Sequence, residues 1–452
     1  MAGTRQMRAA GETYLPKYDS ETATSYANRL ARAVLTNYFE DAVRNVSAMP
    51  FRRNVTLKDA SPELEGIMAD VDLNGNDLHK FASDVFEDSV VAGLGYIFVD
   101  YPKSSAIAPP GRKPTIADVK KSNARPYWVQ VTAENVLSCY FSIHDDGKIR
   151  MVYARILEET HDEPIPGVFT ESVTRRVREL FFNDLGQPSW RLYRQSVNEK
   201  GEQTWVVDEE GVFTISRLPF VPVIAGRRRQ DGTVKPLFLD LGFKQIEHYQ
   251  SSSDQRNILT ASRFPILAVA GAKPEFKADE KPAFGPYTLL FTEDAQGKWY
   301  WVEVQGTAIA QGQKDLEVLT DELRVMGLQP VIADTGGVTA TARSIDESRA
   351  HTSIEKAAIN LNDALNQALA LTEEWLGSES KATVTVNRDF GLSLTAKSEI
   401  DSLLKMRATG EISRETFWLE MKRRGVLNPD FDDEKEKLMI ESESLGGNVP
   451  EA

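Results

Sequence analysis

A glycine-containing segment in the C-terminal half of the chain is the first candidate for chemistry. Residues 333–350 read ADTGGVTATARSIDESRA, and a long helical pattern begins directly after the glycines. A flexible loop that leads into a helix N-terminus is a common way to hold a phosphate group. A nucleotide-binding P-loop, however, requires G-x-x-x-x-G-K-[ST], because its Lys meets the β- and γ-phosphates. Gly336 and Gly337 are followed by Val, Thr, Ala and Thr, so the sequence argues against a nucleotide site.

An acidic segment near residue 70 is the second candidate. Residues 70–77, DVDLNGND, match the first six positions of a calcium-binding loop, but Phe81 stands at the twelfth position, where a bidentate Glu is required. Asp and Asn side chains also turn the chain and cap a following helix, so we expect a capping turn here. Asp70 and Asp72 could instead belong to a two-metal nuclease site, although no other compact acidic cluster completes one.

The remaining catalytic patterns are weaker. The five histidines are scattered, which gives no spacing for a zinc site or a Cys–His dyad. Residues 93–98, GLGYIF, hold only a fragment of the dinucleotide-binding pattern and lie in a strand context. Cys139 is the single cysteine, which excludes an intramolecular disulfide and agrees with a reducing compartment. We therefore expect no enzyme activity, no cofactor and no metal.

The charge of the chain bears on nucleic-acid binding. The sequence has 67 acidic and 53 basic residues, a net charge of −14. Such a chain is a poor candidate for gripping nucleic acid, because that affinity comes from Lys and Arg that neutralise phosphates, but it could surround nucleic acid without holding it. Three basic clusters, at 51–54, 120–125 and 227–229, are candidates for phosphate contact, although each is more typical of a solvated surface.

The sequence also predicts where the chain folds. No apolar run approaches the length of a membrane span, and the N-terminal segment lacks the apolar stretch of a signal peptide. We therefore expect the chain to fold in the cytoplasm.

Hydrophobic periodicity predicts an α+β fold. Helical spacing appears at 20–49, 76–93, 238–264, 314–327, 342–376, 395–408 and 414–424. Short aromatic and β-branched segments separated by turns predict an antiparallel β-rich block at 125–225. A smaller β module is expected at 265–305 and a strand at 382–390. At about 1.5 Å per residue the helix at 342–376 would reach roughly 50 Å, the length of a helix that spans a molecule or lines an interface.

Several residues are expected to begin or end these helices. Ser20 or Thr22 is predicted to cap the first helix. Near the C-terminus, Gly410 is expected to stop one helix and Ser413 to cap the next.

The order of these elements resembles that of the portal (head–tail connector) proteins of tailed bacteriophages, and more specifically a portal family catalogued only as a domain of unknown function. The stretches that carry the resemblance are GETYLPKYDSETATSYANRLARAV, VDLNGNDLHKFA, RPYWVQVTAENV, HYQSSSDQRNIL, NRDFG and ISRETFWLEMKRRGVL. They occur in this order from residue 11 to residue 427, so the resemblance covers nearly the whole chain. The order of the stretches, rather than any single one, is the evidence.

The resemblance implies a portal-type architecture. Its parts would be a wing (1–237), a stem helix (238–264), a clip (265–305), a second stem helix (306–327), a tunnel loop (328–341), a long wing helix with a return strand (342–394), and crown helices with a disordered tail (395–452). The residues implied to line the DNA channel are Gln329, Val331, Asp334, Thr335, Gly336, Gly337, Val338, Thr339 and Arg343. Those implied to contact adaptor proteins in the clip are Lys273, Lys277 and Lys281. Because the loop holds no Lys, we expect steric contact and backbone N–H groups, rather than salt bridges, to act on the DNA.

The implied function is structural. A ring, normally of twelve copies, would form at one capsid vertex and conduct double-stranded DNA during packaging and ejection. The implied partners are other copies of the chain, double-stranded DNA, a terminase packaging ATPase, the major capsid protein and head-completion or adaptor proteins, with no membrane. The chain would be made and assembled in the host bacterial cytoplasm and would end in the virion.

The charge of the implied channel agrees with this function. Residues 307–377 hold 11 acidic and 5 basic residues, and an acidic channel lets phosphates slide rather than bind.

Two other functions stay open at the level of sequence. One is a metal-dependent nuclease component of a DNA-packaging machine, which would use Asp70 and Asp72. The other is a capsid or adaptor interaction protein without a channel.

Overall fold

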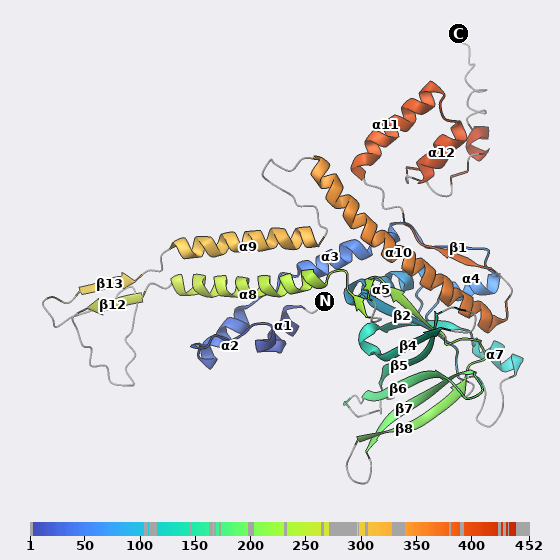
Figure 1. The fold of residues 1–452 in the computed structure, drawn as a ribbon, viewed down its shortest axis with the longest axis horizontal. Coiled ribbons are helices and arrows are strands. Elements are labelled where there is room, and N and C mark those ends of the chain that lie inside the picture. Colours follow the sequence, from blue (N-terminus) through green and yellow to red (C-terminus); the bar gives the residue numbers. More distant parts are fainter. Residues whose placement is uncertain are drawn as a thin grey trace. The chain divides into compact units, whose positions relative to one another are not determined.

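The fold is seen in a computed structural model, whose described residues divide into two compact units. The structure describes residues 3–103, 115–143, 149–161, 173–197, 203–229, 233–263, 266–270, 298–302, 306–327, 340–378, 381–388, 393–423 and 434–439, with a few single positions or pairs between these ranges. The first unit holds residues 1–46, 90–94 and 226–350, and the second holds 47–89, 95–225 and 351–452. Both units mix helices with strands, which confirms the predicted α+β class (Figure 1).

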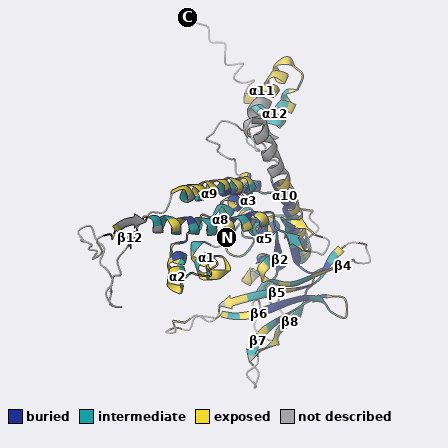
Figure 2. Ribbon diagram, turned by 60° about the vertical axis from the view of Figure 1, so that its left-hand side comes forward, coloured by how far each residue is buried: buried dark blue, intermediate teal, exposed yellow. Residues whose placement is uncertain are grey.

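The first unit is organised around two long antiparallel helices, α8 (Leu239–Ser262) and α9 (Gly306–Met326). Between them in sequence, β12 (Ile266–Ala270) pairs antiparallel with β13 (Lys298–Val302). The other elements of this unit are α1 (Thr4–Ala10), the 3-10 turn η1 (Gly11–Thr13), α2 (Ala23–Arg32), α3 (Tyr38–Ser47), β10 (Arg227–Arg228) and β11 (Val234–Lys235). Helix α8 lies between α9 on one side and α2 on the other, as Figures 1 and 2 both show.

The second unit contains two larger antiparallel arrangements of strands. A meander of five strands runs in chain order through β4 (Val136–Ile143), β5 (Ile149–His161), β6 (Val173–Phe182), β7 (Pro188–Val197) and β8 (Gln203–Val212). A three-stranded sheet has the order β3 (Tyr127–Thr132), β2 (Leu94–Asp100) and β9 (Phe220–Ile224). These sheets confirm the predicted β-rich block at 125–225.

Helices and short elements complete the second unit. The helices that lie wholly or mostly in this unit are α4 (Pro62–Met68), α5 (Leu78–Ala92), α7 (Ile116–Ser122), α10 (Ala340–Leu376), α11 (Ser393–Thr409) and α12 (Arg414–Arg423). The short elements are the pair β1 (Thr56–Lys58) and β14 (Thr383–Thr385), with the 3-10 turns η2 (Pro50–Arg52) and η3 (Ala133–Asn135). The 37 residues of α10 confirm the long helix that the sequence predicts.

The core of the second unit forms around Trp128. Its side chain is fully buried, its indole Nε1 donates to Thr372 Oγ1 of α10 at 2.8 Å, and its ring meets Phe81 of α5 edge-on. The C-terminal part of α10 is buried along one stripe, whose residues include Ile354, Ala358, Leu361, Leu365 and Ala368 (Figure 2). The apolar periodicity that predicts the helix is therefore the stripe that packs into the core.

The helix predicted at 20–49 is wrong in one respect, because the structure has two helices there. Helix α2 ends at Arg32 and α3 begins at Tyr38. The backbone groups between them bond to other parts of the unit: Arg8 donates to the Ala33 carbonyl at 2.9 Å, and Gln245 of α8 donates to the Thr36 carbonyl at 2.9 Å. These tertiary partners replace the helical hydrogen bonds.

The strand predicted at 382–390 is shorter than expected. Among residues 381–388, which the structure describes, only 383–385 pair as a strand. The N–H groups of Val384 and Val386 bond to the amide oxygens of Asn366 and Asn362 on α10, at 2.9 and 3.1 Å. A helix side chain thus takes the place of a partner strand. Helices α1, α4 and α7 lie outside the helical patterns found in the sequence.

The predicted helix caps are confirmed where the structure describes them. Thr22 accepts from the Ser25 N–H at 3.1 Å, and Ser413 accepts from the Thr416 N–H at 3.0 Å. Gly410 ends α11 with φ of 80°, a left-handed conformation that Gly adopts without a Cβ penalty.

Candidate functional site

Helices α8 and α9 form the candidate site, and they approach each other closely at Gly312. A Cβ at this position would overlap the side chain of Gln255 on α8. The amide of Gln255 is buried and donates to the Ile309 carbonyl at 2.8 Å. Glycine therefore leaves room for the buried amide of one helix to reach the backbone of the other.

The rest of the contact between α8 and α9 combines apolar and polar side chains. Leu319 and Leu323 of α9 are buried, and Lys244 of α8 bridges Glu322 of α9 at 2.8 Å. His248 Nε2 lies 3.4 Å from Thr320 Oγ1, and burial lowers the pKa of this imidazole, which keeps it neutral at pH 7. These directional contacts fix how one helix lies along the other more closely than apolar contacts alone would.

A buried arginine fastens α2 to α8. The side chain of Arg29 is 2% exposed and bonds both carboxylate oxygens of Glu21, at 3.1 and 2.8 Å, while Glu21 is 4% exposed. Arg29 also lies 3.5 Å from Asp254 of α8 and donates to the Pro16 carbonyl at 2.7 Å. Its guanidinium lies over the Tyr18 ring, 4.2 Å from the centroid. The residue therefore links three segments of the first unit.

The electrostatics of this cluster follow from its contacts. The hydrogen bonds from Arg29 hold the pKa of Glu21 below its usual range. Burial and the hydrogen bond to Asp254 raise the pKa of Tyr18 to about 12. At neutral pH the cluster thus holds an ionised acid, a permanent cation and a neutral phenol.

Sequence reasoning did not single out Arg29. The residue lies three positions after Tyr26, inside the apolar stripe of the first predicted helix, and a charge within an apolar stripe is the signal that could have found it. Its partner Glu21 precedes the Thr22 cap, so the pair does not follow helical spacing.

The structure does not describe the side chains of the residues that are predicted to line the channel or to contact adaptor proteins. Residues 328–339, with Gln329, Val331, Asp334, Thr335, Gly336, Gly337, Val338 and Thr339, lie outside the described residues, as do Lys273, Lys277 and Lys281. Arg343 lies in the first turns of α10, but its side chain is not among those described.

The acidic segment at 70–77 forms the capping turn that the sequence predicts. Asp77 caps α5 by accepting from the Lys80 N–H at 2.8 Å. Asp72 accepts from two backbone N–H groups of the turn, at 2.9 and 3.3 Å. Asp70 accepts from the Gly75 N–H at 2.8 Å and pairs with Arg125 Nη2 at 2.9 Å. These carboxylates are thus engaged within the turn.

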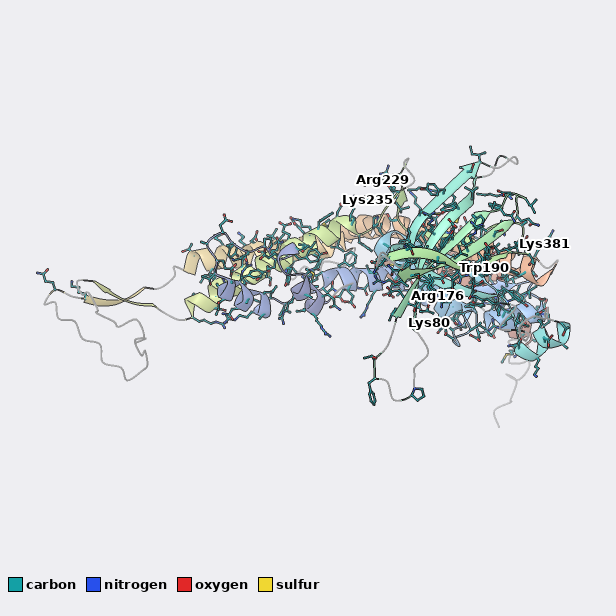
Figure 3. The ribbon with its side chains drawn as sticks, turned by 90° about the horizontal axis from the view of Figure 1, so that it is seen from below. Lys80, Arg176, Trp190, Arg229, Lys235 and Lys381 are labelled. Carbon is teal, nitrogen blue, oxygen red and sulfur yellow. The ribbon has the colours of Figure 1, made fainter. Side chains whose placement is uncertain are left out.

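Two of the predicted basic clusters differ in their contacts and exposure. Arg125, from the cluster at 120–125, holds the acidic turn. The arginines of 227–229 are exposed at the β10–β11 hairpin, where Figure 3 shows Arg229 close to Lys235, and Lys235 pairs with Asp240 at 2.8 Å. Among the described residues, no group of three or more His, Cys, Asp or Glu side chains could hold a metal ion. No helix in the described part of the chain is long and apolar enough to cross a membrane.

A comparison with protein-family models gives a match over the region that contains α8, α9 and α10. A family model described as "Domain of unknown function (DUF4055)" matches residues 236–376, which run from the start of α8 to the end of α10. No curated protein matches the sequence.

Solved structures similar to this chain include subunits of gene transfer agent (GTA) particles. One is from the neck of an empty GTA particle computed with C6 symmetry (11% identity, TM-score 0.43, covering 84% of this chain and 88% of that one). Another is from the neck of a native GTA particle computed with C12 symmetry (11% identity, TM-score 0.42, 92% of each chain). A third is from the virion of a native GTA particle (10% identity, TM-score 0.41, 90% of this chain and 96% of that one). These are distant likenesses.

Proposed function

We propose that this chain is a structural component of a phage-like virion and, within the virion, the portal protein. In this role copies of the chain form a ring at a capsid vertex and conduct double-stranded DNA during packaging and ejection. The ring also serves as a docking platform for a packaging ATPase and for head-completion proteins. The chain itself carries out no catalysis.

One observation carries the proposal: the succession of α8, the β12–β13 pair, α9 and the 37-residue α10. Two helices packed antiparallel, with a small β module between them in sequence, match the stem and clip that the sequence resemblance implies. The long helix then follows the segment assigned to the tunnel loop. Helices of this length, fixed by polar contacts such as Gln255 to Ile309, suit side-by-side packing in a ring.

Charge supports a conduit rather than a DNA-gripping protein. The whole chain has a net charge of −14, and residues 307–377 hold 11 acidic and 5 basic residues. Because tight binding needs cations that neutralise phosphates, an acidic ring of this kind would let DNA pass. A separate ATPase must then supply the work, since the chain lacks the P-loop Lys.

The mass of the purified chain tests assembly. Light scattering coupled to size exclusion should give a particle many times heavier than one 50.5 kDa chain, and the particle should stay intact on dilution. A particle of one or two chains under all solvent conditions would remove the ring from the proposal.

A nuclease assay tests the absence of catalysis. With Mg²⁺ or Mn²⁺, the purified chain should leave linear and supercoiled DNA uncut, because the carboxylates of Asp70 and Asp72 already bond within their own turn. Cleavage that disappears in Asp70→Ala, but persists in a control that removes the Asp118 carboxylate from the capping box of α7 (Asp118→Ala), would establish a nuclease instead.

A further inference from the structure

The first unit carries opposite charges on its two sides. Helices α1 and α2 contain no acidic residue and four arginines, Arg5, Arg8, Arg29 and Arg32, of which Arg29 is buried and paired with Glu21. Helix α9 contains four acidic residues and two basic ones: Asp315, Glu317, Asp321, Glu322, Lys314 and Arg324. Because α8 lies between α2 and α9, the basic and acidic sides face away from each other (Figures 1 and 2).

The basic side has a notch between α2 and α8, lined by Arg29, Arg32, Ala33, Ser253, Arg256 and Asn257. Its enclosed volume of about 10 Å³ holds roughly one water, and its mouth is open. At the notch, the buried Ser253 hydroxyl has no hydrogen-bond partner among the described residues. Arg32 and Arg256 are exposed, and the structure gives their guanidinium groups no ion pair within the described residues. Two cations without an ion pair in the described part of the chain, beside a hydroxyl with no partner there, are chemistry that recognises an anion.

The α9 side carries exposed carboxylates, whose charge is opposite to that of the arginines at the notch. Glu317 and Asp321 lie one turn apart on the outer face of α9. Their contacts within the chain are weak: Glu317 accepts from Gln313 at 3.4 Å, and Asp321 lies 3.5 Å from Arg324. Val318 and Val325, on the same face, are 51% and 55% exposed. An outward face that combines apolar side chains with loosely held carboxylates is suited to a partner that brings cations and apolar contact.

We infer that neighbouring copies of the chain meet through these two sides, so that the α9 carboxylates of one copy contact the exposed Arg32 and Arg256 at the rim of the notch in the next. The inference rests on the proposed ring and names its contact surface. The two sides differ in charge and lie on opposite faces of α8, so the interface is head-to-tail, the kind that generates a closed ring when the rotation closes. A second copy is favoured over DNA as the occupant, because the matching acidic surface is present on the same chain.

Charge reversal on each side tests the inference. The basic-side variant Arg32→Glu/Arg256→Glu and the acidic-side variant Glu317→Lys/Asp321→Lys should each lose roughly tenfold or more of the ring fraction seen by light scattering, since like charges that meet across an interface oppose association. Lys381→Glu reverses an exposed charge in the second unit and should assemble as the unchanged chain does. Melting curves by circular dichroism should show that the variants remain folded.

Combining the charge reversals tests whether the two surfaces contact each other. Both the chain with all four reversals and an equimolar mixture of the two double variants should regain rings, because opposite charges then meet again at every contact. Rings in both double variants at the level of the unchanged chain would overturn the inference while leaving the portal proposal intact. Rings that persist in the basic-side variant but retain less duplex DNA would assign the notch to phosphates instead. If the unchanged chain forms no ring at all, the proposed function itself fails.

Discussion

Replacing Trp128 with alanine should lower the free energy of unfolding of the second unit by about 3–5 kcal/mol, the usual cost of truncating a large buried aromatic side chain. The substitution leaves a cavity between α5 and α10, because the ring is fully buried against Phe81. It also removes the donor to Thr372 Oγ1. Urea denaturation followed by far-UV circular dichroism measures the loss without depending on tryptophan fluorescence.

A matched control separates burial from the loss of any tryptophan. Trp205 lies on β8 and is 47% exposed, so Trp205→Ala should change stability by about 1 kcal/mol or less. Thr372→Val keeps the volume but leaves the indole N–H unpaired, which should cost roughly 1–3 kcal/mol. Equal effects of Trp128→Ala and Trp205→Ala would contradict the packing described for the core.

Replacing Arg29 with methionine should destabilise the first unit by about 3–5 kcal/mol, because breaking a buried ion pair leaves an uncompensated charge. Glu21 would remain buried without its principal hydrogen-bond donor. The double variant Arg29→Met/Glu21→Leu should recover much of this loss, since it removes both charges. Arg44→Met, which breaks an exposed ion pair with Glu40 on α3 of the same unit, is the control and should change stability by about 1 kcal/mol or less.

The pH dependence of stability shows whether loss of the ion pair causes the destabilisation of Arg29→Met. The folded-state pKa of Glu21 lies below its usual value of 4.5, so the ion pair stabilises the fold above that pH and loses its contribution as the pH falls through the lowered pKa. Arg29→Met should remove this acid-sensitive contribution, so the stability gap between the two proteins narrows in acid. A gap that stays constant from neutral pH to acid would show that packing, and not the ion pair, causes the loss.

The sequence alone predicts the long elements of this fold well. Residues 238–264 and 342–376 show apolar periodicity over many turns, and the structure has α8 and α10 there, because such stripes pack wherever the chain offers a core. The break after Arg32 could not be predicted, since it depends on hydrogen bonds from Arg8 and Gln245, which lie far away in sequence.

The candidate site was predicted only in part. Periodicity predicts α8 and the part of α9 from residue 314 onward. The close approach of the two helices at Gly312 depends on a buried amide of the facing helix and could not be predicted. The acidic turn at 70–77 followed from its residue types, because Asp and Asn bond locally to backbone N–H groups. The opposite charges on the two sides of α8 are not visible in the sequence, since α2 and α9 are nearly 300 residues apart and only the fold sets them on either side of one helix.

The central claim is that copies of this chain form a ring around a channel, and electron microscopy of the purified protein tests it most directly. The proposal predicts closed rings with an axial hole wide enough for duplex DNA in negatively stained end-on views. Particles that are monomeric, or assemblies that are solid along their axis, would contradict the portal assignment and favour an interaction protein without a channel.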